Sequence, residues 1–576
     1  MKIRFRRLTQ IGIALFALLF LRLGYLQVLR GVRYARLSDR NRIRRIVLPA
    51  PRGKIFDRNG VLLADTRPSW TVAVIPTETN DSALTLLSTI LNQPVEDIKR
   101  RLEPIAAFPA PVNICRDVPL KTVAQIEENN FRLPGVLVRV DPVRNYPYRN
   151  LYAHSIGYLG EITEEELSRD TSYRRLDYIG KTGIEAKYER YLRGRDGFEF
   201  VEVDVRGREI GPLLEKRPEP PIPGKDIHLT IDHRLQSLAY ELTAKYERAA
   251  VVGILVKTGE VLCLVSRPDF DPNIFLSPLN AARWESLVFN PSKPFFNRAI
   301  SSGYPPGSTF KPLVALLAQE LGLVTPQTTL LPCSGVFRYG NRDFKCWSRH
   351  GRLNLLGAIE QSCNTYFYQL GMRIRVDTLA SFCERFGLGR TTGIDIPGEG
   401  TGNIPSRDFL NRRYGKGKWT QGVMLNFAIG QGEILLTPLQ LALAYAGIAN
   451  NGFYHQPRLV LNIDSAGRTI LCPGGERFVI PLQQEAINAV KRALTRVVLY
   501  GTGRAAQIQE ITIAGKTGTA QNPPRPDHAL FVGYAPAEEP EVVFAVVCEN
   551  AGHGGAVAAP IVSELVRAYF ANKTGQ

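Results

Sequence analysis

The first thirty residues pair a basic tip with a long apolar segment. Met1–Arg7 is rich in Lys and Arg, and Leu8–Leu29 is mostly apolar, with Arg22 near its outer end. A helix of this length crosses a bilayer core of about 30 Å. Arginine-rich sequence, and no small-residue cleavage site, follows the apolar segment, which favours an uncleaved anchor over a signal peptide. The basic flank is expected to stay in the cytoplasm, which places the remaining chain outside.

Residues 31–220 predict a mixed α/β domain. A strand-like run lies at Trp70–Ile75 and a helical stretch at Ser82–Leu91, with frequent Gly and Pro breaks. The proline-rich segment Lys216–Lys225 is typical of an extended linker. We therefore predict three parts: a cytoplasmic tip with a transmembrane anchor over residues 1–30, a mixed domain over 31–220, and a C-terminal domain over 221–576.

The C-terminal part predicts strands at both ends with helices between them. A strand at His228–Asp232 precedes a helix at Arg234–Tyr246, and apolar runs on either side of a Thr-Gly turn predict a hairpin. Helical stretches dominate residues 310–386. The predicted hairpin strands, the late strands and the last helix are Ala250–Leu255, Val261–Ser266, Ile511–Gly515, Ala529–Tyr534, Val542–Cys548 and Pro560–Ala571. The predicted fold class is α/β (α+β), with one central antiparallel sheet, built from both ends of the domain and flanked by helices.

Composition changes this picture in one respect. The 576 residues have ordinary globular composition, but 72 Lys and Arg against 54 Asp and Glu give a net charge of +18. Such a charge favours an anionic lipid or acidic polymer as partner, or reflects a well-solvated basic surface. Dense basic blocks interleaved with aromatic residues are missing from the sequence, so we predict no nucleic-acid binding.

Ser308 and Lys311 form the first candidate catalytic pair. They lie in Tyr304-Pro-Pro-Gly-Ser-Thr-Phe-Lys-Pro312, where a turn leads into a helical stretch. The N–H groups at a helix start can hold an oxyanion. A lysine one helical turn from a serine can lose its proton when desolvated and activate the hydroxyl as a nucleophile. A Ser-x-x-Lys pattern alone is also compatible with a capping serine and a surface lysine.

Two further elements strengthen this hypothesis. Ser362 and Asn364 form a Ser-x-Asn after a predicted helix, and Lys-Thr-Gly occurs at Lys181, Lys516 and Lys573. Lys181 lies in the preceding domain and Lys573 near the C-terminus, whereas Lys516 lies in the predicted sheet. Together the elements predict an acyl-transfer site: a nucleophile with its base, a second hydroxyl, an orienting amide and a cationic strand edge.

The order of these elements matches the site of penicillin-recognising serine enzymes, and the resemblance extends along the chain. The stretches that carry it outside the site are Arg52–Gly60, Arg144–Pro147, Ala153–Tyr158, Gly180–Glu185, Ile429–Gly432 and Thr437–Gln440. They resemble the pedestal and transpeptidase motifs of class B penicillin-binding proteins. Ala153-His154 and His350–Asn354 are more similar to the elongation type than to the division type.

The resemblance implies a D,D-transpeptidase without a cofactor, for which β-lactams trap the catalytic serine. Ser308 would attack the penultimate D-Ala of a stem peptide, Ser362 would shuttle the proton and Asn364 would orient the acyl part. Lys516, Thr517 and Thr519 would bind the substrate carboxylate, with Gly518 leaving room at the strand edge. Implied partners are peptidoglycan stem peptides, the lipid-linked precursor, a SEDS-type glycosyltransferase and elongation-complex proteins at the bacterial inner membrane.

Four other functions share parts of this pattern. One is a wall-synthesis scaffold with an inactive site, which the three intact motifs disfavour. A division-type member of the family has the same motifs. A β-lactamase also has them but normally lacks a pedestal, and a β-lactam sensor needs several membrane spans and a signalling domain. The pedestal and the single apolar segment favour the transpeptidase.

A cluster of cysteines near Ser362 leaves three alternatives open. Cys333, Cys346 and His350 have a spacing compatible with zinc, and the resemblance implies metal ligands near Asp343 and His350 in some elongation-type members. A Cys333–Cys346 disulfide and free buried thiols are the other two. No metal is predicted.

Overall fold

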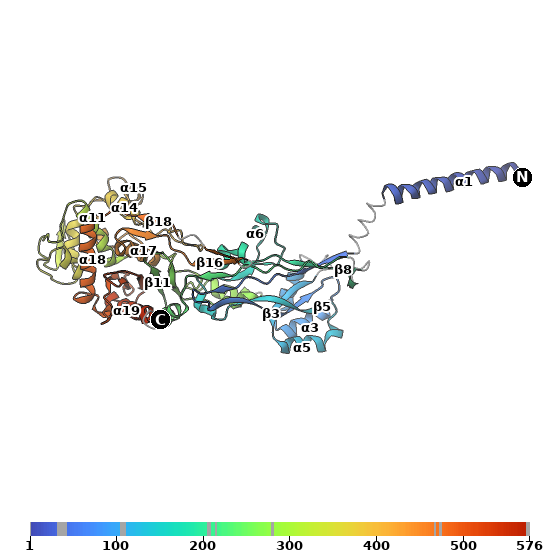
Figure 1. Ribbon diagram of the computed structural model, residues 1–576, viewed down its shortest axis with the longest axis horizontal. Coiled ribbons are helices and arrows are strands. Elements are labelled where there is room, and N and C mark those ends of the chain that lie inside the picture. The colour runs from blue at the N-terminus through green and yellow to red at the C-terminus, as the bar shows by residue number, and fades with distance from the viewer. Residues whose placement is uncertain are drawn as a thin grey trace.

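The computed structural model describes residues 2–30, 43–103, 111–203, 209–213, 216–277, 281–465, 468–471 and 475–571. The ribbon is elongated, with the helical end of the C-terminal domain far from the pedestal strands (Figure 1). The apolar N-terminal segment forms helix α1 (Lys2–Gly24) and continues as a π-helical turn over Tyr25–Leu29. A 21-residue stretch, Leu8–Val28, is long and apolar enough to cross a membrane, and none of it is buried.

The pedestal is built around a seven-stranded mixed sheet in the order β17-β16-β10-β2-β3-β4, with β5 also paired to β3. Helices α3, α4 and α5 pack with strands β3, β4 and β5 around a small core that is separate from the main one. The elements are β2 (Ile55–Phe56), β3 (Leu62–Val74), α3 (Asp81–Leu91), α4 (Val95–Leu102), β4 (Val112–Val118), α5 (Leu120–Glu128) and β5 (Val136–Asn145). The predicted strand at 70–75 and helix at 82–91 are confirmed.

Smaller elements complete the pedestal. A three-stranded antiparallel sheet has the order β1-β8-β9, and β6 pairs with β7. Their bounds are β1 (Ile43–Leu48), β6 (Leu159–Glu161), α6 (Glu164–Arg169), β7 (Tyr178–Gly180), α7 (Gly183–Lys187), α8 (Glu189–Leu192), β8 (Gly197–Val203) and β9 (Glu209–Pro212).

The segment predicted as a linker is extended but hydrogen-bonded. Glu219 and Ile222 form isolated bridges to Phe198 and Arg195. Just beyond it, β10 (Ile227–Leu229) pairs in parallel with β2 and antiparallel with β16 (Val460–Ser465), whose other neighbour is β17 (Arg468–Leu471). Strands from both predicted domains therefore share one sheet, which ties the pedestal to the C-terminal domain.

The C-terminal domain contains the predicted five-stranded antiparallel sheet, in the order β12-β11-β21-β20-β19. Its strands are β11 (Ala249–Leu255), β12 (Val261–Arg267), β19 (Ala514–Ala520), β20 (His528–Ala535) and β21 (Val542–Cys548). Val251 and Phe531 face a core shared with α9 (His233–Leu242) and α19 (Gly554–Ala571). Val252 and Val532 face the main core, which includes α17 (Pro438–Ala449). Burial on both faces explains the continuous apolar runs of these strands.

The helical part differs from the prediction in one region. Between α11 (Lys311–Glu320) and α12 (Leu355–Glu360), a hairpin of β13 (Val336–Tyr339) and β14 (Arg342–Lys345) projects from the domain. Its side chains are exposed or half-buried, so it lacks the alternation by which a strand facing a core is recognised. The other helices and strands are α10 (Ala281–Val288), α13 (Asn364–Gly371), α14 (Val376–Arg385), α15 (Arg407–Tyr414), α16 (Val423–Phe427), β15 (Phe453–His455), β18 (Arg477–Val479) and α18 (Gln484–Leu499).

Four predicted boundaries were wrong. Strand β10 ends at Leu229, three residues before the predicted end at Asp232. Helix α9 ends at Leu242, and α19 begins at Gly554 and contains Pro560. Strand β19 begins at Ala514, so Lys516 lies within it instead of following it. The prediction failed there because Lys516 and Gly518 are residue types depleted in strands, yet in the fold this segment is buried and paired with β20.

Candidate active site

Ser308 lies in a short 3₁₀ turn, Gly307–Phe310, that leads into α11. Gly307 has a φ of +54°, and a Cβ atom there would lie 2.8 Å from Thr519 O, so this position requires glycine. Its N–H donates to Gly430 O at 2.8 Å. Thr309 and Phe310 are buried, whereas Ser308 is half-buried. The Gly307 hydrogen bond and the buried neighbours thus hold the turn in place, and Ser308 remains partly exposed within it.

Lys311 is fully buried and joins Ser362 and Asn364. Its Nζ donates to Ser362 O at 2.7 Å, to Asn364 Oδ1 at 2.7 Å and to Ser362 Oγ at 3.3 Å. These three acceptors match the three hydrogens of a charged ammonium group. Burial lowers the pKa of Lys311 to about 8. Near neutral pH the amine can therefore give up a proton and offer a lone pair as a general base.

Ser362 lies in the turn between α12 and α13, with a φ of +54°. A non-glycine residue rarely adopts this conformation, so neighbouring contacts must hold it. Asn364 is the first residue of α13, and its Nδ2 donates to Lys345 O at 3.3 Å. The structure thus brings Lys311, Ser362 and Asn364 together, as the sequence predicted.

Strand β19 contributes the third element. Lys516 is fully buried, and its Nζ donates to Thr517 O at 3.2 Å and to Thr517 Oγ1 at 3.5 Å. Burial, followed by the nearby charge of Lys311, holds the pKa of Lys516 well below its usual value. Thr517 Oγ1 also lies 2.7 Å from Thr502 Oγ1. Lys516 is thus a buried partner of Thr517, and the Thr517 hydroxyl contacts both Lys516 Nζ and the Thr502 hydroxyl.

The nucleophile turn packs directly on β19. A Cβ atom at Gly518 would lie 2.9 Å from Pro306 O, so only glycine lets the two segments approach this closely. The partly exposed Thr519 follows, and its carbonyl accepts from Gln431 Nε2 at 3.2 Å. Lys516, Thr517, Gly518 and Thr519 thus line one strand beside the Ser308 turn.

The other Lys-Thr-Gly copies lie elsewhere. Lys181 Nζ pairs with Glu166 at 2.5 Å in the pedestal. Lys573 lies outside the described residues. Of the copies that the structure describes, only the one at Lys516 borders the Ser308 turn.

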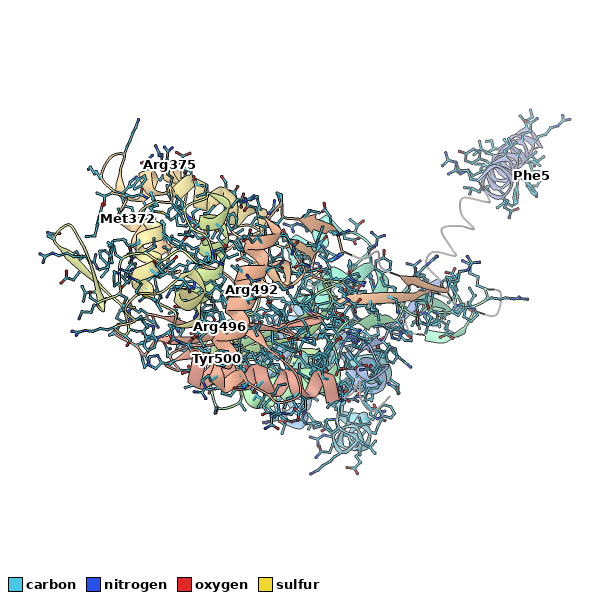
Figure 2. The ribbon with its side chains drawn as sticks, turned by 60° about the vertical axis from the view of Figure 1, so that its left-hand side comes forward. Phe5, Met372, Arg375, Arg492, Arg496 and Tyr500 are labelled. Carbon is cyan, nitrogen blue, oxygen red and sulfur yellow. The ribbon has the colours of Figure 1, made fainter. Side chains whose placement is uncertain are left out.

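Sequence reasoning missed several supporting residues. Tyr445 Oη donates to Thr309 O at 2.9 Å, and Thr502 contacts Thr517. Thr502 lies two residues after the exposed Tyr500, which caps α18 on the same side of the molecule as Arg492 and Arg496 (Figure 2). The Gly501-Thr-Gly503 turn was the available signal: a Cβ atom at Gly501 would lie 2.4 Å from Glu360 O. Glycine there allows α18 to end against the Ser362 turn.

The pedestal motifs meet in one buried network. Glu185 accepts from Arg52 Nε at 2.6 Å and from Arg144 Nε at 2.7 Å, and Arg52 also bonds Glu189 at 2.6 Å. Arg52, Arg144 and Glu185 come from three segments that are far apart in the sequence. The network therefore holds these three segments together within the pedestal.

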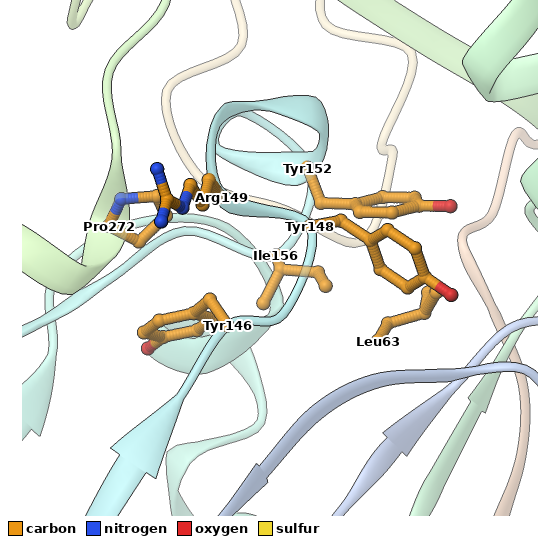
Figure 3. A pocket seen from close by; sticks show the side chains of 7 residues that line it. All are labelled: Leu63, Tyr146, Tyr148, Arg149, Tyr152, Ile156 and Pro272. Atoms are coloured by element: carbon orange, nitrogen blue, oxygen red, sulfur yellow. The ribbon is translucent and has the colours of Figure 1, made fainter.

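A small hollow lies at the junction of the two domains (Figure 3). Its lining residues are Leu63, Tyr146, Tyr148, Arg149, Tyr152, Ile156 and Pro272. Tyr152 Oη lies 2.6 Å from His233 Nδ1 of α9. The hollow is lined by none of the predicted site residues.

The cysteine cluster includes one residue, Cys363, that the sequence analysis did not consider with the others. The donor atoms of Cys333, Cys346, His350 and Cys363 all lie within 4.8 Å of one another. Asp343 is exposed on β14 and is not part of this group, and Cys363 supplies the fourth donor. Cys333 and Cys346 are free thiols in the structure, which therefore does not form the disulfide that the sequence left open as one of three alternatives. Three thiols and an imidazole fit a tetrahedral zinc site.

The comparisons with known proteins agree with this geometry. A family model of the penicillin-binding protein transpeptidase domain matches residues 249–567, and one of the penicillin-binding protein dimerisation domain matches residues 47–229. The peptidoglycan D,D-transpeptidase MrdA of Acinetobacter baumannii is 36% identical over 577 residues, covering 95% of this chain and 85% of its own.

Two solved structures share the architecture. A complex between PBP2 and MreC from Helicobacter pylori has 26% identity and a TM-score of 0.79, covering 92% of this chain and 100% of that chain. A peptidoglycan synthase complex that coordinates polymerization and crosslinking has 30% identity and a TM-score of 0.72, covering 98% of both chains. The chain belongs to the class B penicillin-binding proteins, and within them to the elongation-type peptidoglycan D,D-transpeptidases homologous to MrdA.

Proposed function

We propose that Ser308 forms the acyl-enzyme of this transpeptidase, with Lys311 as its general base. The observation that carries the proposal is the set of bonds from Lys311 Nζ to Ser362 and Asn364, which places the base between two motifs beside the nucleophile turn. The neutral amine accepts the Ser308 hydroxyl proton as Oγ attacks the carbonyl of the penultimate D-Ala. The C–N bond to the terminal D-Ala then breaks, and the proton passes through Ser362 Oγ to the leaving amine.

The second half of the reaction uses the same groups. An amine of a neighbouring stem peptide attacks the acyl-enzyme, its proton returns through Lys311, and Ser308 is released. Backbone N–H groups of Ser308 and Thr519 form the oxyanion hole in this mechanism, which the packing of Gly518 against Pro306 supports. Thr517 and Thr519 bind the substrate carboxylate, and Lys516, which is hydrogen-bonded to Thr517, supports this part of the strand from its buried position.

We further propose that α1 anchors the protein in the bacterial cytoplasmic membrane with the catalytic domain on the periplasmic side. The apolar stretch Leu8–Val28 and the basic tip support this orientation. By analogy with the relatives in complexes, the implied partners are a SEDS-type glycosyltransferase and elongation-complex proteins such as MreC.

A reconstitution with the full chain tests the activity. Purified protein is incubated with lipid-linked precursor and a polymerase, and the digested product is analysed by liquid chromatography and mass spectrometry. Cross-linked muropeptide dimers with release of D-Ala are expected for the wild type and not for Ser308→Ala. Equal dimer formation by the variant would refute the assignment of Ser308.

A further inference from the structure

Two exposed aromatic side chains lie beside the catalytic turn. Trp347 is 60% exposed, and Tyr500, the residue that caps the C-terminus of α18, is 64% exposed. Trp347 Nε1 donates to Gln361 O at 3.1 Å, and Gln361 directly precedes Ser362 in the sequence. Exposed aromatic residues that border an active site are typical of a binding surface.

Hydrogen bonds and a ring contact join the two aromatic residues into one surface. Gln361 Nε2 donates to Glu360 Oε1 at 2.9 Å, and Glu360 Oε2 accepts from Arg496 Nε at 2.6 Å. The guanidinium carbon of Arg496 lies 5.6 Å from the centre of the Tyr500 ring. We call Trp347, Glu360, Gln361, Arg496 and Tyr500 the aromatic shelf. Because a neighbour holds each member, the shelf is preformed, which lowers the entropy cost of binding.

At its far end the aromatic shelf adjoins strand β19. Thr502 lies two residues after Tyr500, and its Oγ1 lies 2.7 Å from Thr517 Oγ1. A Cβ atom at Gly501 would lie 2.4 Å from Glu360 O, so the turn after α18 lies directly against the shelf. The shelf therefore connects the catalytic turn to the strand that lines the substrate site.

The surroundings of the aromatic shelf carry positive charge. Segments 345–352 and 491–504, which contain the two aromatic residues, have basic but no acidic residues. Glu360 is 7% exposed and paired with Arg496, so its charge is compensated. Such a surface attracts carboxylates, which arginine binds with paired hydrogen bonds. The exposed basic residues of the two segments are Lys345, Arg349, Arg352, Arg492, Arg496 and Arg504.

We propose that the aromatic shelf binds the glycan strand of the peptidoglycan substrate. The C–H face of a sugar ring packs on the electron-rich face of an aromatic ring, here Trp347 and Tyr500. Sugar hydroxyls bond the polar groups of Gln361 and Arg496, and stem-peptide carboxylates pair with the exposed arginines. The inference rests on the proposed function and deepens it, since it assigns a second contact to the substrate that Ser308 attacks.

The length of a stem peptide supports this occupant. An extended chain spans about 3.5 Å per residue, so a stem of about five residues keeps its sugar within roughly 18 Å of the carbonyl under attack. The glycan strand is therefore close to the catalytic turn throughout the reaction. The aromatic shelf begins at the residue before Ser362 and lies within this reach.

Strand binding by the full-length protein in detergent is the first test. The probes are fluorescent glycan strands with stem peptides, strands from which an amidase has removed the peptides, and the free stem peptide. All variants carry Ser308→Ala in addition, so no covalent adduct contributes to the anisotropy signal. Trp347→Ala and Tyr500→Ala should each raise the Kd for both kinds of strand about three- to tenfold. Phe289→Ala removes an aromatic side chain that is 77% exposed outside the shelf and should leave the Kd unchanged.

Two further measurements separate stacking from other causes. Trp347→Phe keeps an aromatic face without the N–H donor, so it should retain most of the strand affinity that Trp347→Ala loses. Strands with stem peptides should bind more tightly than stripped strands at low salt, and this difference should shrink as salt screens the arginines.

Reconstitution with a polymerase measures what the aromatic shelf contributes to the reaction. Penicillin carries no glycan strand, so its acylation rate reports the state of the catalytic groups alone. In Tyr500→Ala the ratio of the cross-linking rate to the acylation rate should fall about fivefold, because only the polymer contacts the shelf. Penicillin labelling of Ser308→Ala would refute the catalytic assignment without affecting strand binding, so the two proposals fail separately.

Three results would overturn the proposal: equal strand affinity with and without the combined Trp347→Ala and Tyr500→Ala changes, an equal loss of affinity in Phe289→Ala, or a loss confined to the free stem peptide.

Discussion

The buried network around Glu185 gives a prediction whose size follows from the structure. Glu185 is fully buried and accepts from Arg52 at 2.6 Å and Arg144 at 2.7 Å. In Glu185→Gln, Arg52 keeps its bonds to Glu189, but the side chain of Arg144, 1% exposed, loses its counter-ion. An uncompensated buried charge costs about 3–5 kcal/mol, so the pedestal should lose stability by that amount.

The pH dependence of this loss has a definite sign. Burial alone raises the pKa of Glu185, but the guanidinium groups of Arg144 and Arg52 outweigh it and hold the pKa below the ordinary value. A carboxylate with a depressed folded-state pKa stabilises the fold above its unfolded pKa of about 4.3, and this stabilisation is lost as the pH falls. The difference between wild type and Glu185→Gln should therefore be constant near neutral pH and shrink in acid.

The assay is urea-dependent proteolysis of the pedestal, because a chain of several domains does not unfold as one unit. Glu165→Gln is the matched control: the same chemical change at a pair with Arg169 whose side chains are 75% and 72% exposed, where no measurable shift is expected. If the urea concentration at which half of the pedestal is cleaved is unchanged in Glu185→Gln, or equals that of Glu165→Gln, the reasoning about the network is refuted.

Three further predictions concern the active site. Because the pKa of Lys311 is lowered to about 8, the acylation rate should rise about tenfold between pH 7 and pH 9 as the neutral base accumulates, and a flat profile in stopped-flow measurements would contradict this role. Lys516→Ala should slow labelling by fluorescent penicillin, whereas Lys181→Ala, which removes only a pedestal ion pair, should leave the labelling rate unchanged. The reverse pattern would assign the active-site role to the Lys-Thr-Gly motif at Lys181. Gly518→Ala should slow acylation because its Cβ meets Pro306 O at 2.9 Å, whereas Gly211→Ala, with open space around it, should not, and equal rates would mean that the Ser308 turn tolerates displacement.

The catalytic residues could be predicted because their spacing is set by local geometry. Ser308 and Lys311 lie one helical turn apart, and Ser362 and Asn364 flank a single residue, so each pair is visible in the sequence. The five-stranded sheet was also predictable, since strands buried on both faces form unbroken apolar runs.

The remaining features depend on contacts between distant segments. Cys363 joins Cys333 and His350 only because the hairpin folds back on the catalytic turn, and no pattern in the sequence distinguishes it from Asp343 as the fourth donor. The fully buried Lys516 was likewise expected at an accessible strand edge, because side-chain type predicts exposure for most lysines. The sheet shared by β2, β10 and β16 also joins segments that are distant in the sequence. The proline-rich segment before β10 indicated a linker and gave no sign of this pairing.

The central claim is that Ser308 is the nucleophile of a penicillin-binding transpeptidase, and covalent labelling tests it most directly. The full-length protein is treated with fluorescent penicillin, digested, and the modified peptide is sequenced by mass spectrometry. We expect a single adduct on Ser308, and Ser308→Ala should stay folded, as judged by its protease resistance, and remain unlabelled. Equal labelling of Ser308→Ala, or an adduct on Ser362, would contradict the account.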